Sequence, residues 1–392
     1  MISFENTAIA FQSKSDKDLN KAYWLFRIVG NPSLVRIGKI ATNTALNLGL
    51  PIKGMIRNTI FSQFCGGESI EQCKTAIATL TKYGIGTILD YSIEGKTSDE
   101  DFDATVQEIK RTIDRAAQDN SIPFAVFKVT GIARFGILEK ANALDSVLSE
   151  KEIEELESVK DRINQICKHA DENGIPVFID AEETWIQDII DRITMQMMER
   201  YNTERAIVYN TLQMYRHDRL EFLERSIQET KEKNIWLGIK LVRGAYMEKE
   251  RERAQKIGYP SPIQPDKESS DKDFNAALKL MIDNIDRIAF CAGTHNEASS
   301  LYLTELMKEN NLDPSDKRIF FAQLLGMSDH ISYNLAHHGY NVAKYVPYGP
   351  IKEVMPYLLR RADENTSVAG QTSRELSLII KEKERRKKEG RF

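Results

Sequence analysis

The sequence has 392 residues, 41% hydrophobic and 29% charged, which is ordinary for a globular protein with a large core. Its formal net charge of −4 excludes a general electrostatic attraction to nucleic acid. No apolar run near the start is long enough for a signal peptide or a membrane span, and the four cysteines lack metal-binding spacing. We therefore expect a cytoplasmic protein with buried thiols, no metal site and at most peripheral contact with a membrane.

Residues 1–60 contain helical patterns and no run that resembles a strand. The clearest pattern is DKDLNKAYWLFRIVG, residues 16–30, in which apolar side chains recur at helical spacing. These residues are expected to form a helical arm that packs on the following domain.

From residue 84 onward, short runs rich in β-branched and aromatic residues alternate with longer charged segments of helical periodicity. The runs cover residues 84–92, 123–131, 176–183, 206–215, 236–244, 288–295, 318–326 and 341–349. Every connection is long enough for a parallel crossover. Eight strands alternating with helices predict an α/β protein of the (β/α)8 TIM-like barrel class over residues 61–370, rather than an open doubly wound sheet.

Two segments extend beyond this regular alternation. Residues 132–175 are longer than one crossover helix requires, so an extra helix or a lid is expected there. Residues 371–392 form a basic, helical C-terminal tail that ends in KEKERRKKEGRF. This tail is either a solvated helix end or a weak contact for an anionic membrane surface.

Polar residues recur where the predicted strands end, and in a barrel this is where active sites are built. The residues in these positions are Lys128, Asp180, Glu182, Gln213, Lys240, Arg243, Thr294, His295, Asn296, Gln323 and Tyr345. No serine or cysteine lies beside a suitably placed histidine, so the set favours binding and orientation of a substrate whose chemistry is supplied by a cofactor.

The stretch YLLRRADEN follows the eighth predicted strand. Tyr357, Arg360, Arg361 and Glu364 share one stripe of a helix, which is either a solvated face or part of a site. Because proline is best tolerated at the first position of a helix, we expect a helix or helical segment to restart at Pro356, as the last helix of the barrel, over the active site. The two arginines together with Lys128 suggest an anionic substrate.

The familiar nucleotide-binding motifs are missing from the sequence. The only GxG, at Gly84 and Gly86, precedes its strand and lacks a third glycine, and no Walker-type GxxxxGK is present. A nucleotide cofactor would therefore have to be held by the barrel itself.

Several of these motifs, taken together and in order, resemble those of the proline dehydrogenases, which are flavin-dependent (β/α)8-barrel enzymes. The matching stretches are FCGGES, FKVTG, IDAEE, KLVRGAY, GTHNE, QLLGMSD, YVPYGP and PYLLRRADENTS, and they cover roughly residues 60–370. KLVRGAY and YLLRRADEN are the most specific of them.

The resemblance implies oxidation of L-proline to Δ1-pyrroline-5-carboxylate, the first step of proline catabolism to glutamate. In this reaction hydride passes from proline C5 to N5 of FAD, and a membrane quinone takes the electrons. No second catalytic domain follows in this sequence, so we expect the product to pass to a pyrroline-5-carboxylate dehydrogenase.

The resemblance also assigns roles to individual residues. Lys128, Arg360 and Arg361 would bind the substrate carboxylate, Asp180 and Glu364 would pair with them, and Tyr345, Tyr357 and Leu325 would form walls around the ring. The residues that would contact FAD are Gln213, Lys240, Arg243, Gly244, Ala245, Tyr246, Thr294, His295 and Asn296.

Two alternative activities stay open. Related enzymes that prefer hydroxyproline have a smaller residue at the position of Tyr345, so the tyrosine points to proline. Lys128 and Lys240 lie on predicted strands, where a desolvated lysine could instead form a Schiff base in a lyase or aldolase.

Overall fold

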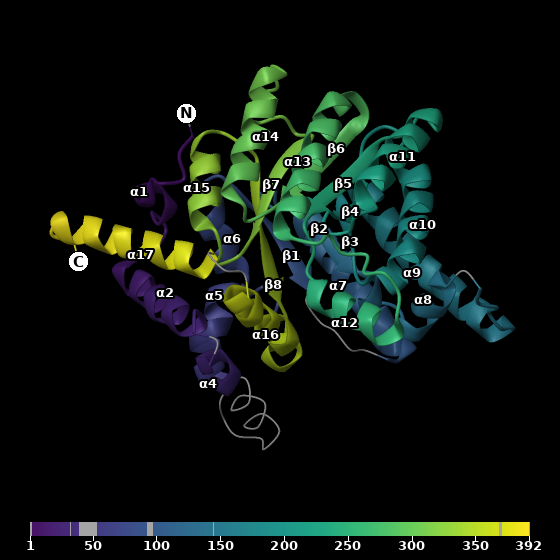
Figure 1. Ribbon diagram of the computed structural model, residues 1–392, viewed down its shortest axis with the longest axis horizontal. Coiled ribbons are helices and arrows are strands. Elements are labelled where there is room, and N and C mark those ends of the chain that lie inside the picture. Colours follow the sequence, from purple (N-terminus) through teal and green to yellow (C-terminus); the bar gives the residue numbers. More distant parts are fainter. Residues whose placement is uncertain are drawn as a thin grey trace. The chain divides into compact units, whose positions relative to one another are not determined.

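The computed structural model describes residues 2–31, 33–38, 53–91, 97–143, 145–367 and 371–391, with the backbone alone for 362–367 and 371–373. Figure 1 shows the chain as helices that alternate with a central set of strands. It divides into two compact units, Met1–Glu94 with Gln323–Phe392, and Gly95–Ala322. We call these the terminal unit and the central unit.

The eight strands form a closed barrel in chain order, and every described strand pair is parallel. The strands are β1 (Ile85–Tyr91), β2 (Phe124–Lys128), β3 (Val177–Asp180), β4 (Val208–Gln213), β5 (Leu237–Val242), β6 (Ile288–Gly293), β7 (Ile319–Leu324) and β8 (Val342–Tyr348). Each lies inside its predicted run, which confirms the (β/α)8 class. The runs read as almost continuously apolar because parallel strands in such a barrel are buried on both faces.

The helices of the central unit follow its strands. They are α7 (Asp99–Ala117), α8 (Phe135–Asn142), α9 (Glu150–Asn173), α10 (Thr184–Tyr201), α11 (Arg219–Glu232), α12 (Met247–Ile257), α13 (Lys267–Asp283) and α14 (Glu297–Glu309). Short 3-10 turns lie at η2 (Val129–Gly131) and η3 (Ile285–Arg287).

The long connection between β2 and β3 holds two helices, α8 and α9, which confirms the extra helix predicted there. The ends of α9 have clear chemical causes. Ser149 and Glu152 form a reciprocal capping box at its start, and Gly174 ends it with a left-handed φ of 66°.

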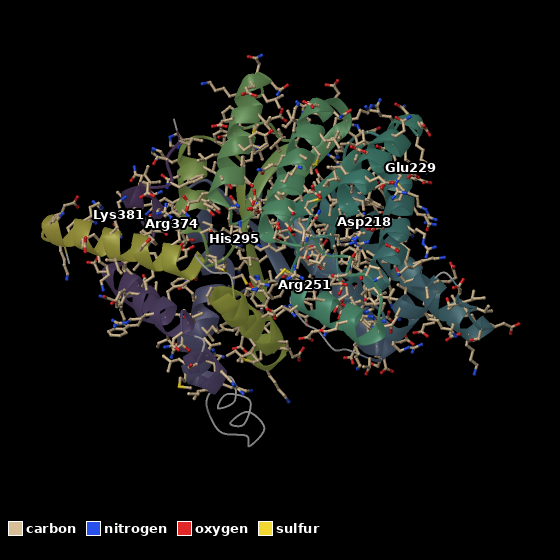
Figure 2. All side chains as sticks on the ribbon, viewed as in Figure 1. Asp218, Glu229, Arg251, His295, Arg374 and Lys381 are labelled. Atoms are coloured by element: carbon tan, nitrogen blue, oxygen red, sulfur yellow. The ribbon has the colours of Figure 1, made fainter. Side chains whose placement is uncertain are left out.

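The terminal unit contains α1 (Thr7–Ala10), α2 (Asp16–Val29), α4 (Lys53–Ile56), the π-helical turn η1 (Arg57–Phe61), α5 (Ser62–Phe64), α6 (Lys74–Thr81), α15 (Asp329–His337), α16 (Ile351–Ser367) and α17 (Gln371–Lys388). Figure 1 shows α2 and α17 side by side, and a buried cluster that includes Leu19, Phe26 and Leu378 joins them. Arg374 and Lys381 of α17, labelled in Figure 2, pair with Glu5 near the N-terminus.

The predicted helix start at Pro356 is wrong. Helix α16 begins five residues earlier, at Ile351, and Pro356 lies inside it. The buried positions Ile351, Val354, Met355 and Leu358 have offsets of zero, three, four and seven, so the apolar stripe that holds this helix starts before the proline.

The four cysteines are buried as free thiols, as predicted. No helix among the described residues is both long enough and apolar enough to span a lipid bilayer. The division into a 1–60 arm, a 61–370 barrel and a 371–392 tail remains a prediction.

Candidate active site

Two lysines share one carboxylate at the strand ends of the central unit. Lys128 and Asp180 are the last residues of β2 and β3 and stand opposite each other in the parallel register. Lys128 Nζ lies 3.5 Å from Asp180 Oδ2, and Lys240 of β5 donates to Asp180 Oδ1. Both Asp180 and Lys240 are buried. Two ammonium groups and one carboxylate therefore lie together at this point, a combination of charges that can bind an anionic ligand.

Glu182 ties the loop after β3 to the loop after β2. Its carboxylate accepts hydrogen bonds from the backbone amide of Thr130, at 3.0 Å, and from the Thr130 hydroxyl. Its backbone carbonyl accepts a 2.7 Å hydrogen bond from Gln213 Nε2. These bonds fix the backbone that follows Lys128 and place Gln213 beside the same loop, although Gln213 was predicted only as a cofactor contact.

Burial raises the pKa of Glu182 from 4.5 to about 7, since the carboxylate loses its water and the hydrogen bonds from Thr130 offset this only in part. A raised pKa means that the folded protein holds a proton that the unfolded chain has released between pH 4.5 and about 7. This contribution to stability is complete below pH 4.5 and is lost as the pH rises through about 7.

Glu182→Gln is therefore expected to gain stability relative to the parent protein as the pH rises from 5 to 8, by about 3 kcal/mol at most. The uncharged glutamine amide can accept from the Thr130 amide and donate to the Thr130 hydroxyl oxygen. Urea unfolding at several pH values measures the difference. Thr79→Ser, an exposed change far along the chain, provides the control. A difference between variant and parent that does not change with pH would contradict this prediction.

A second cluster surrounds Arg243, just after β5. Its guanidinium donates to Asp271 Oδ1 at 2.5 Å, to Thr294 Oγ1 at 2.6 Å and to Ser299 Oγ at 2.9 Å. Asn296 joins through its side chain, 3.3 Å from Asp271 Oδ2. Burial lowers the pKa of Arg243, which Asp271 opposes. The structure thus brings together three of the residues predicted to contact the cofactor, and Asp271 and Ser299 are partners that sequence reasoning missed.

The backbone after Arg243 is open to solvent. Gly244 and Ala245 are exposed, Tyr246 is half-buried, and α12 begins one residue later. Gly244 has a φ of 135°, and a Cβ there would lie 2.5 Å from the Tyr215 ring, so only glycine fits. His295, labelled in Figure 2, is half-buried beside Thr294.

The terminal unit holds the remaining predicted site residues. Tyr345 is buried on β8, and its carbonyl accepts a 2.8 Å hydrogen bond from the amide of Leu325. On α16, Tyr357 and Arg361 are buried, with the guanidinium carbon of Arg361 5.3 Å from the centre of the Tyr357 ring. Arg360 is half-buried. Glu364 lies outside the residues whose side chains the structure describes.

Sequence reasoning missed Lys344, the neighbour of Tyr345. Its side chain is fully buried, and Nζ donates to Asp329 Oδ1 at 2.7 Å, to the Met327 carbonyl at 2.6 Å and to the Leu324 carbonyl at 3.4 Å. The lysine thereby holds the loop that carries Leu325. Its position one residue before a predicted site tyrosine, inside an otherwise apolar strand, was the only signal in the sequence.

A closed barrel with charged groups clustered at the strand ends has the organisation of a (β/α)8-barrel enzyme. The model of the proline dehydrogenase family matches residues 73–374 of this sequence. The chain therefore belongs to the proline dehydrogenase family and is an oxidoreductase.

Individual relatives agree with this assignment. The mitochondrial proline dehydrogenase 1 of Dictyostelium discoideum is 33% identical, over 97% of this chain and 74% of that protein. The hydroxyproline dehydrogenase of Xenopus laevis is 30% identical, over 98% of this chain and 90% of that protein.

A solved structure is similar in fold. It is proline utilization A from Bdellovibrio bacteriovorus inactivated by N-propargylglycine, with a TM-score of 0.73 and 19% identity over 92% of this chain. The present chain spans only 38% of that longer protein, so this likeness supports the barrel fold alone.

Proposed function

We propose that this protein oxidises L-proline to Δ1-pyrroline-5-carboxylate with FAD as its cofactor, and that a membrane quinone takes the electrons. Membership of the proline dehydrogenase family supports the reaction class. The single structural observation that carries the proposal is the Lys128, Asp180 and Lys240 cluster, which places two ammonium groups at the strand ends, where a substrate carboxylate could bind.

Lys128, Arg360 and Arg361 are the proposed carboxylate ligands, with Asp180 and Glu364 as their acidic partners. The structure supports this for Lys128, because Asp180 lies 3.5 Å from it and keeps it charged and oriented. It supports Arg361 through burial of the side chain and through the Tyr357 ring, which lies within cation–π range of the guanidinium. Tyr345, Tyr357 and Leu325 are proposed as apolar walls around the ring.

The residues proposed for FAD have suitable chemistry. Arg243 and Lys240 supply positive charge, and Gly244 and Ala245 present exposed backbone next to the first turn of α12. Cations, accessible amides and a helix start together suit an anionic diphosphate. Gln213, Tyr246, Thr294, His295 and Asn296 complete the proposed set. When bound, FAD supplies the acceptor for the hydride that leaves proline C5.

The chain's own part in the reaction is then binding and orientation. The cationic ligands fix the carboxylate, the aromatic walls fix the ring, and the substrate nitrogen must be unprotonated so that its lone pair assists the departing hydride. Both lysines have Asp180 as an ion-pair partner, which supports a role in binding rather than in covalent chemistry. The family assignment also decides against the lyase alternative.

An anaerobic titration of the purified protein with L-proline tests the proposal. We expect the flavin absorbance to bleach as proline is added and to return on addition of a quinone analogue. A yellow protein whose spectrum does not respond to proline would contradict the proposed substrate.

Preference for proline over hydroxyproline is the second testable element. A hydroxyproline dehydrogenase is among the relatives, so similarity alone does not distinguish proline from hydroxyproline as the substrate. The residues that line the site must determine this preference. Tyr345 is 8% exposed, and its bulk is proposed to exclude a ring hydroxyl. Tyr345→Ser is expected to shift the ratio of kcat/KM values towards hydroxyproline by about tenfold, equivalent to roughly 1.4 kcal/mol. Steady-state kinetics on both substrates measure it, with Tyr302→Ser on α14 as the control. An unchanged ratio would assign selectivity to other residues.

We further propose a cytoplasmic protein, peripheral on the inner face of a membrane, that hands its product to a pyrroline-5-carboxylate dehydrogenase. The Dictyostelium relative is named as mitochondrial, and that location is stated for that protein alone.

A further inference from the structure

A long stretch near the N-terminus contains no acidic residue. The chain has 58 aspartates and glutamates in 392 residues, so 49 residues would hold about seven on average, yet residues 19–67 hold none. The same stretch contains six cations, Lys21, Arg27, Arg36, Lys39, Lys53 and Arg57. Its sequence is therefore strongly cationic within a chain whose net charge is −4.

The same stretch exposes large apolar side chains. Ten large hydrophobic residues are exposed among the described part of the chain, and five of them fall here. They are Trp24 at 57% exposure, Ile28 at 49%, Leu34 at 47%, Ile37 at 63% and Met55 at 61%. Isolated exposed hydrophobic residues are common on protein surfaces, but such a concentration within one short segment indicates an interaction surface.

Helix α2 shows how the two properties combine. Leu19, Ala22, Phe26 and Val29 form its buried stripe. On another stripe, Lys17, Lys21, Trp24 and Ile28 follow one another at spacings of four, three and four and are all exposed.

Cations accompany the exposed apolar groups along this surface. Lys21, Arg27, Arg36 and Lys53 are exposed, and the guanidinium of Arg27 lies 5.5 Å from the Trp24 ring centre. Arg57 differs, because Glu68 pairs with it. Within residues 19–67, a tryptophan and aliphatic residues occur among lysines and arginines and no acidic residue, which is the pattern of a segment that lies in a membrane interface.

The basic C-terminal tail is the competing candidate, but two of its arginines are held by carboxylates. Arg385 bonds to Glu382 and Glu389, and Arg386 bonds to Glu382 and Asp16. Cations held by neighbouring carboxylates attract an anionic surface less than cations without acids nearby.

We propose that the exposed side chains of Trp24, Ile28, Leu34 and Ile37, together with those of Lys21, Arg27 and Arg36, form a face that docks on an anionic lipid bilayer. The bilayer is then the partner that brings the protein to its electron acceptor. This inference rests on the proposed transfer of electrons to a membrane quinone. The apolar groups enter the headgroup boundary while the cations contact anionic headgroups.

Co-sedimentation of the full chain with vesicles tests the proposal without any use of enzyme activity. The vesicles are made of phosphatidylglycerol and phosphatidylcholine in equal parts, or of phosphatidylcholine alone. We expect binding to the anionic vesicles that weakens with added salt. The double variant Trp24→Ser with Ile28→Ser is expected to bind at least about tenfold more weakly, because it loses two interfacial side chains.

Two matched controls separate this face from other surfaces. Val147→Ser with Ile153→Ser removes two exposed apolar side chains elsewhere, and Lys387→Gln with Lys388→Gln removes two exposed tail charges. Both are expected to bind as the parent does. Unchanged binding by the Trp24 and Ile28 variant, equal loss by the tail variant, or equal binding to neutral vesicles would each overturn the proposal.

Activity measurements distinguish this failure from failure of the proposed function. Turnover with a water-soluble acceptor is expected to be the same in the Trp24 and Ile28 variant and the parent. If the parent binds anionic vesicles but proline does not bleach its flavin, the proposed reaction fails and the docking face stands. If proline bleaches the flavin but no vesicle binding occurs, the docking face fails and the proposed reaction stands.

Discussion

Arg361→Met is expected to raise the KM for proline roughly a hundredfold, since one charge-assisted contact to a carboxylate in a desolvated site is worth about 3 kcal/mol. Arg361 is 9% exposed, so bulk water does not replace the lost contact as it would at a surface arginine. Methionine keeps much of the side-chain length and apolar stem. Steady-state kinetics and a proline titration of the flavin spectrum both report the change.

Lys352→Met is the matched control for this prediction. Lys352 also lies on α16 but is exposed, so this variant loses the same charge from the same helix without touching the proposed site. We expect its KM to stay near that of the parent protein. An Arg361→Met variant with unchanged proline affinity would remove Arg361 from the carboxylate ligands.

The barrel was predictable from the sequence because its strands leave a strong local signal. Segments such as Val177–Asp180 and Ile288–Gly293 are runs of apolar, strand-favouring residues, and burial on both faces requires that composition. The start of α16 was mispredicted because a local rule about Pro356 was preferred to the apolar stripe from Ile351 to Leu358. Tertiary packing outweighs the loss of one backbone hydrogen bond at the proline.

The site was predictable to the extent that its residues sit at strand ends. The register explains why Asp180 stands beside Lys128, since both end neighbouring parallel strands. The partnership of Asp180 with Lys240 was not predictable in this way, because β5 is not adjacent to β3 and the contact depends on the curvature of the barrel. No sequence pattern therefore indicated that Lys240, predicted as a cofactor contact, also forms an ion pair with Asp180.

Lys344 illustrates a further limit of sequence reasoning. A lysine in a strand reads as exposed. Its partners are Leu324 at the end of β7, Asp329 at the start of α15 and Met327 in the loop between them, whose shape no local pattern specifies. That loop includes Ser328 with a left-handed φ of 51°, which serine rarely adopts. The buried Lys344 and Asp329 pair lowers the pKa of Asp329 to about 2, so the ion pair persists to acidic pH despite burial of the carboxylate.

Asp180→Ala is expected to be among the most destabilising single changes in the central unit. Asp180 is the carboxylate between Lys128 and Lys240, and the Lys240 side chain is only 6% exposed. Removing the anion takes away the carboxylate that pairs with the buried Lys240 ammonium, and losing one member of a buried pair costs about 3–5 kcal/mol. Urea unfolding, with and without added flavin, separates this loss from any loss of cofactor binding.

The double variant Asp180→Ala with Lys240→Met provides the decisive comparison. If the cost comes from a stranded cation, removing that cation as well should restore most of the lost stability, and the coupling between the two changes should be about 2 kcal/mol or more. Lys256→Met, at an exposed lysine on α12, serves as the control partner and should show no such coupling with Asp180→Ala. If the double variant is no more stable than Asp180→Ala alone, Asp180 acts through packing rather than charge. The proposed role of Asp180 in keeping the lysines charged and oriented towards a carboxylate would then be wrong.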